Sequence, residues 1–271
     1  MKKLILSLSL ALFAVSCSSN DDDETTVPVE ETPVLPTKIS FSNIIDPSGT
    51  IKYNGNKISD ITWEDNAKYV YEYTGSLITK ITEYDGAGAK DLTTDFTYSN
   101  DKLVKSVAAE SNGTRTTTYS YPDANTISFT STRNYTFAGT AQVDKDVTIL
   151  TLNTGNVFAE ETTYYHNNAL AGKISSTYTY DDKASVYTNV SGYDKLLAYN
   201  YTVMDENTAG KNNVLIKNQT NTTVSGSISK YKNVNTMTYS AAGYPKQIAT
   251  KQYNANNQVN DSYVISYDYN K

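Results

Sequence analysis

Cysteine, histidine and tryptophan are nearly absent from the chain of 271 residues, which contains one of each. A single cysteine excludes disulfides within the chain, so the folded state must rely on its core and its sheet hydrogen bonds. Zinc sites built from several Cys and His side chains are excluded by the same count. The one histidine, His166, lies in an Asn-rich stretch that predicts an exposed turn, and no nucleophile motif accompanies it. The sequence therefore predicts no catalytic residues, no metal and no cofactor.

Long apolar runs are lacking after the N-terminus, where residues 4–15 are uncharged and follow Lys2-Lys3. This run is shorter than the ~18 residues of a membrane-spanning helix, and it predicts a signal peptide over residues 1–16. The residues Ala14-Val15-Ser16 before Cys17 resemble the lipobox of bacterial lipoproteins. The resemblance implies cleavage before Cys17, a diacylglycerol on its sulfur and an acyl chain such as palmitate on its new amino group.

Runs of Lys and Arg are also lacking. A nucleic-acid-binding protein needs a basic face that neutralises phosphates, so this class is excluded. The formal net charge is −6, and six of the 29 acidic residues fall within residues 17–37, where there is no base. The body of the protein is therefore close to neutral, and the low isoelectric point belongs largely to its N-terminal part.

Residues 17–38 predict a lipidated cysteine followed by a disordered tether. This range holds three of the six prolines as well as the acidic run, and such a composition cannot offset the entropy cost of folding. The acidic run after Cys17 resembles the lipoprotein export signal of Bacteroidota-type bacteria, which implies a location on the outer face of the outer membrane. The alternative is a solvated charge run that only keeps the tether extended.

Residues 39–271 predict a single β domain made of repeated hairpins. The repeated signature is an aromatic-x-aromatic pair, a polar turn and a segment that begins with Leu, Ile or Val, as in Tyr71-Glu72-Tyr73 before Leu77-Ile78. The pair recurs at residues 96–98, 119–121, 178–180, 199–201 and 267–269. Alternation with period two predicts strands with one buried face, and Asn54-Gly55 is typical of a tight hairpin turn. The predicted fold is all-β, an antiparallel meander that forms one long curled sheet or an open or closed barrel.

The segment Tyr84-Asp85-Gly86-Ala87-Gly88 and the Tyr-x-Tyr pairs are similar to the YD repeats of Rhs-type surface proteins. The Arg that usually follows the turn Gly in those repeats is replaced here by Ala87. Residues 40–271 resemble more closely an uncharacterised lipoprotein family of Bacteroidota with a porin-like fold, in which repeated hairpins make one long curled sheet. That resemblance assigns no functional residue.

Paired acidic residues do not predict a hydrolytic site. Adjacent residues such as Glu160-Glu161 or Asp181-Asp182 face opposite sides of a strand, so they cannot act together on one glycosidic bond. The sequence leaves open whether two carboxylates from different strands come together to form such a site. The stretch that begins at Asp205-Glu206 has Ile216 where a calcium loop needs a bidentate Glu, so it predicts a turn.

Tyrosine is the abundant aromatic residue, with 24 Tyr against 6 Phe. One interpretation is that tyrosine pairs across strands stabilise a thin sheet, each pair by about 0.2–1 kcal/mol. The other is that tyrosines form a platform on which sugar rings or peptides stack. The candidate binding residues are Trp63, Tyr71, Tyr73, Tyr119 and Tyr121.

The leading functional prediction is a non-enzymatic scaffold or interaction module, held at the outer membrane by its lipid, with a polysaccharide or a surface protein as partner. One alternative is a glycan-binding surface lipoprotein that supports polysaccharide capture, and another is a half-barrel lipid carrier. A transmembrane barrel is least favoured, because it requires an apolar outer band of about 25 Å and the predicted strands carry polar residues on both faces.

Overall fold

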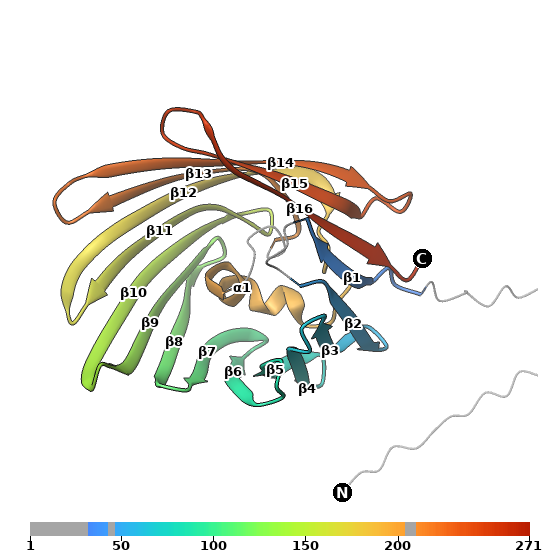
Figure 1. The fold of residues 1–271 in the computed structure, drawn as a ribbon, viewed down its shortest axis with the longest axis horizontal. Coiled ribbons are helices and arrows are strands. Elements are labelled where there is room, and N and C mark those ends of the chain that lie inside the picture. The colour runs from blue at the N-terminus through green and yellow to red at the C-terminus, as the bar shows by residue number, and fades with distance from the viewer. Residues whose placement is uncertain (1–31, 43–46, 204–209) are drawn as a thin grey trace, which may run out of the picture. The chain divides into compact units, whose positions relative to one another are not determined.

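The computed structural model describes residues 32–42, 47–203 and 210–271, which form one closed antiparallel β-barrel around a short helical segment (Figure 1). Within this described part, sixteen strands follow one another around the barrel in sequence order. The first eight are β1 (Pro36–Phe41), β2 (Gly49–Asn54), β3 (Lys57–Trp63), β4 (Lys68–Thr74), β5 (Leu77–Tyr84), β6 (Lys90–Ser99), β7 (Lys102–Glu110) and β8 (Gly113–Asp123). The others are β9 (Thr126–Phe137), β10 (Thr140–Asn153), β11 (Asn156–His166), β12 (Ala169–Ala184), β13 (Asn212–Thr223), β14 (Ile228–Tyr239), β15 (Pro245–Tyr253) and β16 (Val259–Tyr269).

The barrel closes because the first strand pairs with the last. β1 runs antiparallel to β16, with Lys38 opposite Asp268 and Phe41 opposite Ile265, and its other edge pairs with β2. Closure leaves no free sheet edge that could pair with another chain. The all-β antiparallel prediction is confirmed, and of its alternatives the closed barrel is the one that forms. β1 begins at Pro36, three residues before the predicted start of the β domain.

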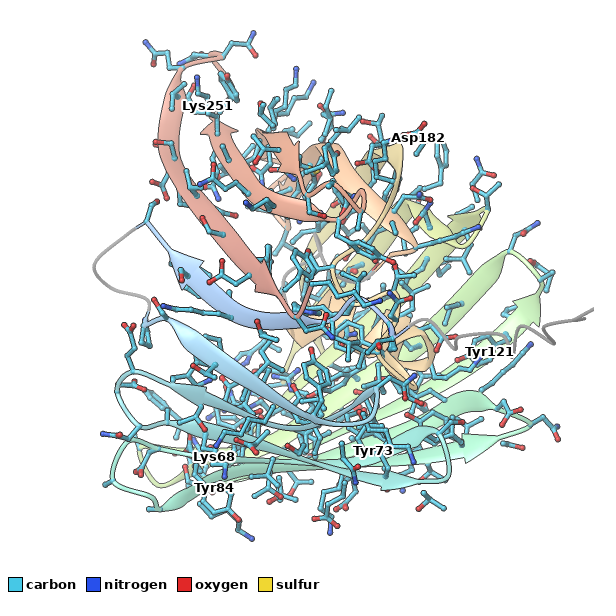
Figure 2. All side chains as sticks on the ribbon, turned by 90° about the vertical axis from the view of Figure 1, so that its right-hand side faces the viewer. Lys68, Tyr73, Tyr84, Tyr121, Asp182 and Lys251 are labelled. Carbon is cyan, nitrogen blue, oxygen red and sulfur yellow. The ribbon has the colours of Figure 1, made fainter. Side chains whose placement is uncertain are left out.

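Side chains alternate between the lumen and the outer face of the barrel. Ile51, Ile61 and Tyr71 are buried on the inner face of β2, β3 and β4. The neighbouring outward positions are mostly polar, and Lys68 and Lys251, labelled in Figure 2, belong to them. The outer face of the middle strands β8 to β12 includes Thr116, Thr118, Thr130, Lys145, Glu161, Thr163, Lys173 and Ser175.

The second tyrosine of several aromatic pairs has a structural role. The hydroxyls of Tyr98, Tyr121 and Tyr180 donate to backbone carbonyls of the preceding strand, at distances of 2.7, 3.0 and 2.8 Å. Their rings pack against the buried core of the barrel. Because the ring is partly buried and the hydroxyl donates to a carbonyl, tyrosine fits these positions better than phenylalanine, which would lack this hydrogen bond. This arrangement explains part of the tyrosine excess by stability alone.

Residues 185–203, which we call the plug, leave the sheet after β12 and lie inside the ring of strands (Figure 1). The plug contains the 3-10 turn η1 (Tyr193–Leu196) and the helix α1 (Leu197–Val203). None of the helices in the described part of the chain is long and apolar enough to cross a membrane. The plug's buried side chains include Val186, Tyr187, Val190, Tyr193, Leu196, Ala198 and Tyr199.

The hairpin prediction for Tyr199-Asn200-Tyr201 is therefore wrong, because these residues lie in α1. Burial of an apolar side chain such as Leu196 contributes about 1.5–3 kcal/mol, and the lumen offers this burial to a helix that leaves the sheet. The Tyr-x-Tyr pattern alone does not distinguish a strand from such a helix.

The plug is fixed to one rim of the barrel. Ser191 N donates to Asn56 O at 2.9 Å, and Asn189 Nδ2 donates to Tyr244 Oη at 2.8 Å. Asn56 lies in the β2–β3 turn, and the chain enters and leaves the barrel at this same rim, at Pro36 and Tyr269. We call it the plug rim and the opposite one, with the β3–β4, β5–β6 and β7–β8 connections, the far rim.

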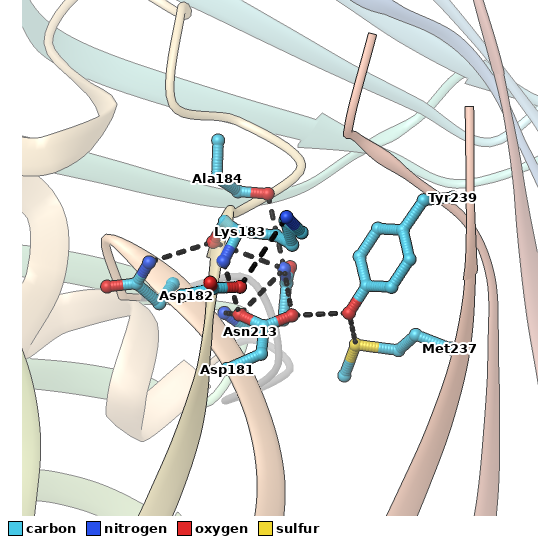
Figure 3. Close-up of polar contacts among 8 residues, drawn as sticks. Asp181, Asp182, Lys183, Ala184, Asn213, Met237 and Tyr239 are labelled. Carbon is cyan, nitrogen blue, oxygen red and sulfur yellow. Dashed lines mark hydrogen bonds and ion pairs between the residues drawn. The ribbon is translucent and has the colours of Figure 1, made fainter. Parts of the chain in front are cut away.

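A buried polar cluster fixes the place where the chain leaves β12 for the plug (Figure 3). Asp181 Oδ1 accepts a hydrogen bond from Asn213 N at 3.0 Å, and Asp181 Oδ2 accepts from Asn213 Nδ2 at 3.0 Å and from the hydroxyl of Tyr239. Asn213 Nδ2 also donates to Ala184 O at 3.2 Å. Asn213 is fully buried, and these bonds satisfy its backbone N–H and its side-chain Nδ2, while its Oδ1 has no partner. Together they link β12, β13 and β14.

Substitution of Gly192 tests the contact between the plug and the plug rim. Its φ is +73°, and a Cβ atom there would lie 2.4 Å from Ser76 O. Gly55 has φ +63° with nothing within 4 Å of its added Cβ, so it is a matched control for backbone strain alone. We expect both Gly→Ala variants to lose about 1 kcal/mol of unfolding free energy from positive φ, and Gly192→Ala to lose a further 1–3 kcal/mol. Equal losses in chemical denaturation would show that the plug does not pack against this rim.

Candidate functional site

A polar cavity of about 630 Å³ occupies the lumen between α1 and the inner faces of β6 to β13. Most of the side chains that line it carry a hydroxyl group, an amide or a charge. The lining residues are Leu92, Thr94, Ser106, Ala108, Glu110, Arg115, Thr117, Phe129, Ser131, Asp146, Thr148, Glu160, Thr162, Tyr164, Ile174, Tyr199, Lys217 and Gln219. The wall of the barrel thus encloses a space suited to a ligand that forms many hydrogen bonds.

Two arginines and two carboxylates on the cavity's side nearest the β7–β8 turn neutralise one another. Arg133 Nε donates to Glu110 Oε2 at 2.6 Å, and Arg115 lies 3.7 Å from both Glu110 Oε1 and Asp146 Oδ2. Burial raises the pKa of Asp146, and the positive charge of Arg115 opposes this shift. This cluster leaves no net charge, so it favours neither an anionic nor a cationic ligand.

Hydroxyl groups form a layer deeper in the same cavity. Thr148 Oγ1 and Thr162 Oγ1 share a hydrogen bond of 2.9 Å, and Thr162 Oγ1 also donates to Glu160 Oε1 at 3.1 Å. Tyr178 Oη donates to the other oxygen of Glu160 at 2.8 Å. Burial, together with the negative charges of Glu160 and Asp146, raises the pKa of Tyr164 to about 12, so its hydroxyl stays a donor. The cavity therefore presents both donors and acceptors in fixed positions.

A second cavity of about 320 Å³ lies on the opposite side of the plug, against β1, β3 to β6 and β16. It shares Leu92 and Tyr199 with the polar cavity, but its lining is mainly aromatic and aliphatic. Its lining residues are Ile39, Phe41, Ile58, Ile61, Trp63, Tyr69, Tyr71, Ile81, Glu83, Leu92, Tyr187, Tyr193, Tyr199, Ile265 and Tyr267. We call it the aromatic cavity.

Three polar groups of the aromatic cavity have no partner. Trp63 Nε1 and Tyr71 Oη are buried without a hydrogen bond, and the Tyr71 side chain is only 6% exposed. The side chain of Glu83 forms no ion pair or hydrogen bond with any residue that the structure describes. Burial, and to a smaller extent the charge of Asp91, raises the pKa of Glu83. Unpaired buried polar groups are costly, and in native proteins they often mark a place where a ligand or water binds.

The structure separates the five aromatic residues that the sequence singled out. Trp63 and Tyr71 meet in the aromatic cavity. Tyr119 Oη shares a hydrogen bond of 3.1 Å with Ser106 Oγ, a residue of the polar cavity. Tyr73 and Tyr121 lie at the plug rim, where Tyr73 Oη accepts a hydrogen bond from Ile58 N. They do not form one common platform.

Other residues singled out in the sequence lie apart from both cavities. His166 is 53% exposed at the end of β11, with Nδ1 at 2.7 Å from Asp144 Oδ1. Cys17, residues 18–31 of its predicted tether and Asp205-Glu206 lie outside the described residues. The last part of the predicted tether is ordered, because Leu35 is buried and β1 begins at Pro36. Within the part of the chain that the structure describes, no group of three or more His, Cys, Asp or Glu side chains is placed to hold a metal ion.

The residues that line the polar cavity are not among those that the sequence pattern singled out. Arg115 lies in the run Thr114 to Thr118 on β8, where inward and outward positions are both polar. A strand without an apolar face was the signal, because a wall between water and a packed core would alternate. The carboxylate in the aromatic cavity, Glu83, comes from β5 and not from Glu64 or Asp65, the acidic neighbours of Trp63.

Comparison with known proteins identifies a fold and no family. No family model and no curated protein matches the sequence. A porin-like protein from Bacteroides vulgatus ATCC 8482 is similar in structure, with a TM-score of 0.60 and 16% identity over 88% of this chain and 99% of that chain. This chain shares its fold. A porin-like protein from Bacteroides uniformis ATCC 8492 has a TM-score of 0.48 and 12% identity over 86% of this chain and 96% of that chain.

The unpaired carboxylate of Glu83 predicts a pH dependence of stability. Because its pKa is raised above the ordinary value of 4.5, the folded state holds a proton that the unfolded state releases, and stability falls as pH rises through this range. We expect Glu83→Gln to be more stable than the wild type at pH 7, and this difference to shrink as the pH falls through the raised pKa of Glu83 toward 4.5 and to be lost below it. Glu72→Gln, on the exposed outer face of β4, is the control and should change little. Thermal unfolding across this pH range measures both, and a destabilised Glu83→Gln at pH 7 would contradict the assignment.

Proposed function

We propose that this protein is a non-enzymatic, lipid-anchored binding module of the outer membrane, and that its barrel lumen takes a neutral, hydroxyl-rich ligand of the saccharide class. The observation that carries the proposal is the polar cavity of about 630 Å³, whose hydroxyls and balanced charges line the inside of a closed wall. Cavities of roughly 300–1,000 Å³ are the usual size for ligand sites, and a scaffold that acts only through its surface has no need of one.

The chemistry of the lining favours a saccharide over a lipid. An acyl chain would displace water from Thr148, Thr162 and Ser131 and leave the remaining hydrogen-bonding capacity of their hydroxyls unused, which is unfavourable. A sugar offers hydroxyls that donate and accept, and Phe129 and Tyr164 provide aromatic surface for its C–H faces. The surface-scaffold and lipid-carrier hypotheses have no comparable support.

A binding role without catalysis is supported by how the cavity's carboxylates are used. Glu110 and Asp146 lie beside arginines, and Glu160 accepts hydrogen bonds from Tyr178 and Thr162. A general acid in glycoside hydrolysis must be free to give its proton to the leaving oxygen, whereas these three carboxylates already contact donors in the wall of the barrel. These carboxylates are arranged to hold a ligand.

The outer face of the barrel supports anchoring by lipid instead of insertion into the membrane. The outward positions of the middle strands hold mostly Thr, Ser, Lys and Glu, with single apolar residues such as Val147 and Ile149 between them, whereas a lipid-facing barrel needs a continuous apolar band about 25 Å tall. Exposed large apolar side chains are found instead mainly near hairpin tips on the far rim: Phe137, Leu170, Val224, Ile228 and Val259. An anchor at Cys17, followed by the acidic tether, would join the barrel at the plug rim and leave the far rim available to a polysaccharide or a surface protein.

Removal of the N-terminal segment tests how the protein is held at the membrane. We expect a variant without residues 1–31 to remain monodisperse in buffer without detergent, because the wall exposes polar side chains. Size-exclusion chromatography with light scattering measures this, and circular dichroism confirms the β content. Aggregation that only detergent relieves would show that the barrel itself inserts into the bilayer.

Binding of saccharides is tested with two adjacent threonines on β11. Thr162 faces the cavity, and Thr163 faces outward between Val147 and Lys173. Neutral oligosaccharides are first screened on an array, and calorimetry then measures the strongest with Thr162→Val and Thr163→Val. We expect the first change to weaken binding about five- to tenfold, the value of one hydrogen bond, and the second to have no effect. An array on which the folded protein binds no oligosaccharide, or equal losses in both variants, would overturn the proposal.

A further inference from the structure

We propose that the aromatic cavity is a separate binding site for an organic ammonium ion that also carries an oxygen atom, as an amino alcohol does. This site goes beyond the saccharide site, because it uses other residues and recognises another chemical class. The two cavities share only Leu92 and Tyr199.

Aromatic rings surround part of the cavity in different planes. The Trp63 ring lies 6.4 Å from that of Phe41 at an interplanar angle of 34° and 5.7 Å from that of Tyr69 at 72°. Rings at such angles present faces and edges to one volume. The negative face of an aromatic ring attracts an organic cation, with Trp the strongest of the three ring types.

Glu83 supplies the counter-charge. Among the residues that the structure describes, it is the single carboxylate in the lining, and none of the others there is a Lys, Arg or His. The sheet register places Glu83 between Tyr69 of β4 and Leu92 of β6, both of which line the same cavity. A partly buried carboxylate without a partner is destabilising, so its presence here is best explained by a cation that binds beside it.

The unpaired polar groups of the cavity further limit the chemical class of its ligand. Trp63 Nε1 is only a donor and needs an acceptor, while Tyr71 Oη can donate or accept. A hydroxyl or ester oxygen on the ammonium compound would satisfy both. A bare metal ion would find one carboxylate and no further ligands, an anion would be repelled by Glu83, and an acyl chain would leave all three groups unpaired.

Choline and its neutral isostere test the site directly. 3,3-Dimethylbutan-1-ol has the same shape and hydroxyl as choline without the positive charge. With the full chain in an uncharged polyoxyethylene detergent, we expect calorimetry or tryptophan fluorescence to detect choline and the isostere to bind at least tenfold more weakly. Tetramethylammonium, which lacks the oxygen, should bind more weakly than choline. Equal binding of choline and the isostere would overturn the proposal.

Variants and vesicles complete the test. Glu83→Gln should abolish choline binding while the protein stays folded, since this change removes an unpaired charge, and Glu72→Gln on the outer face should bind as the wild type does. Vesicles of phosphatidylcholine, compared with phosphatidylglycerol, distinguish a lipid head group from a free amino alcohol as the source. If the protein binds free choline or phosphatidylcholine vesicles and Glu83→Gln loses this binding, the site is supported. If the protein binds neither, the proposal is overturned. Saccharide binding in the polar cavity should not change in Glu83→Gln, so failure of one site leaves the other intact.

Discussion

The width of the barrel is the constraint on which the rest of the structure depends. A closed sheet of sixteen strands encloses more space than the side chains of its own wall can fill. The chain meets this constraint by returning residues 185–203 into the lumen, where Tyr187, Tyr193 and Tyr199 pack against the wall. The ring of Tyr199 lies 4.7 Å from that of Phe96 at 85°, and its hydroxyl donates to Thr94 Oγ1 at 3.4 Å. The plug fills one end of the lumen and leaves two cavities of different chemistry on either side of Tyr199.

Stability and binding are divided between the two ends of the barrel. At the plug rim, buried apolar residues such as Ile58, Ile78 and Leu103 pack around tyrosines whose hydroxyls pair with backbone groups. Away from that rim the wall carries unpaired or mutually neutralised polar groups, which contribute little to folding. Glu83, Trp63 and Tyr71 are expected to lower the stability of the free protein, and ligand sites commonly carry such a cost. The plug-rim core offsets it.

The sequence predicts the strands well because hairpin signals are local. Period-two alternation predicts strands with one buried face, and in β4 the alternate residues Tyr69 and Tyr71 both line the aromatic cavity. The turn at Asn54-Gly55 is displaced by one residue, since Asn54 pairs with Lys57 and Gly55-Asn56 form the turn. Closure depends on β1 meeting β16, a pairing between chain ends that no local pattern specifies. The plug escaped prediction because its Tyr-x-Tyr pair matches the strand signature. The partners Arg133 and Glu110, 23 positions apart, become neighbours only through the register of three strands.

Thiol labelling along β9 tests most directly whether the barrel is closed around an accessible polar lumen. In a Cys17→Ser background, single cysteines replace Ile127 in the packed core, Ser128 on the outer face and Ser131 in the polar cavity. A small methanethiosulfonate and a large polymer-linked maleimide are then compared. The account predicts that Ser128→Cys reacts with both reagents, Ser131→Cys with the small one only, and Ile127→Cys with neither. Reaction of Ser131→Cys with the large reagent would mean that the sheet is open, and no reaction with either would mean that the lumen is filled.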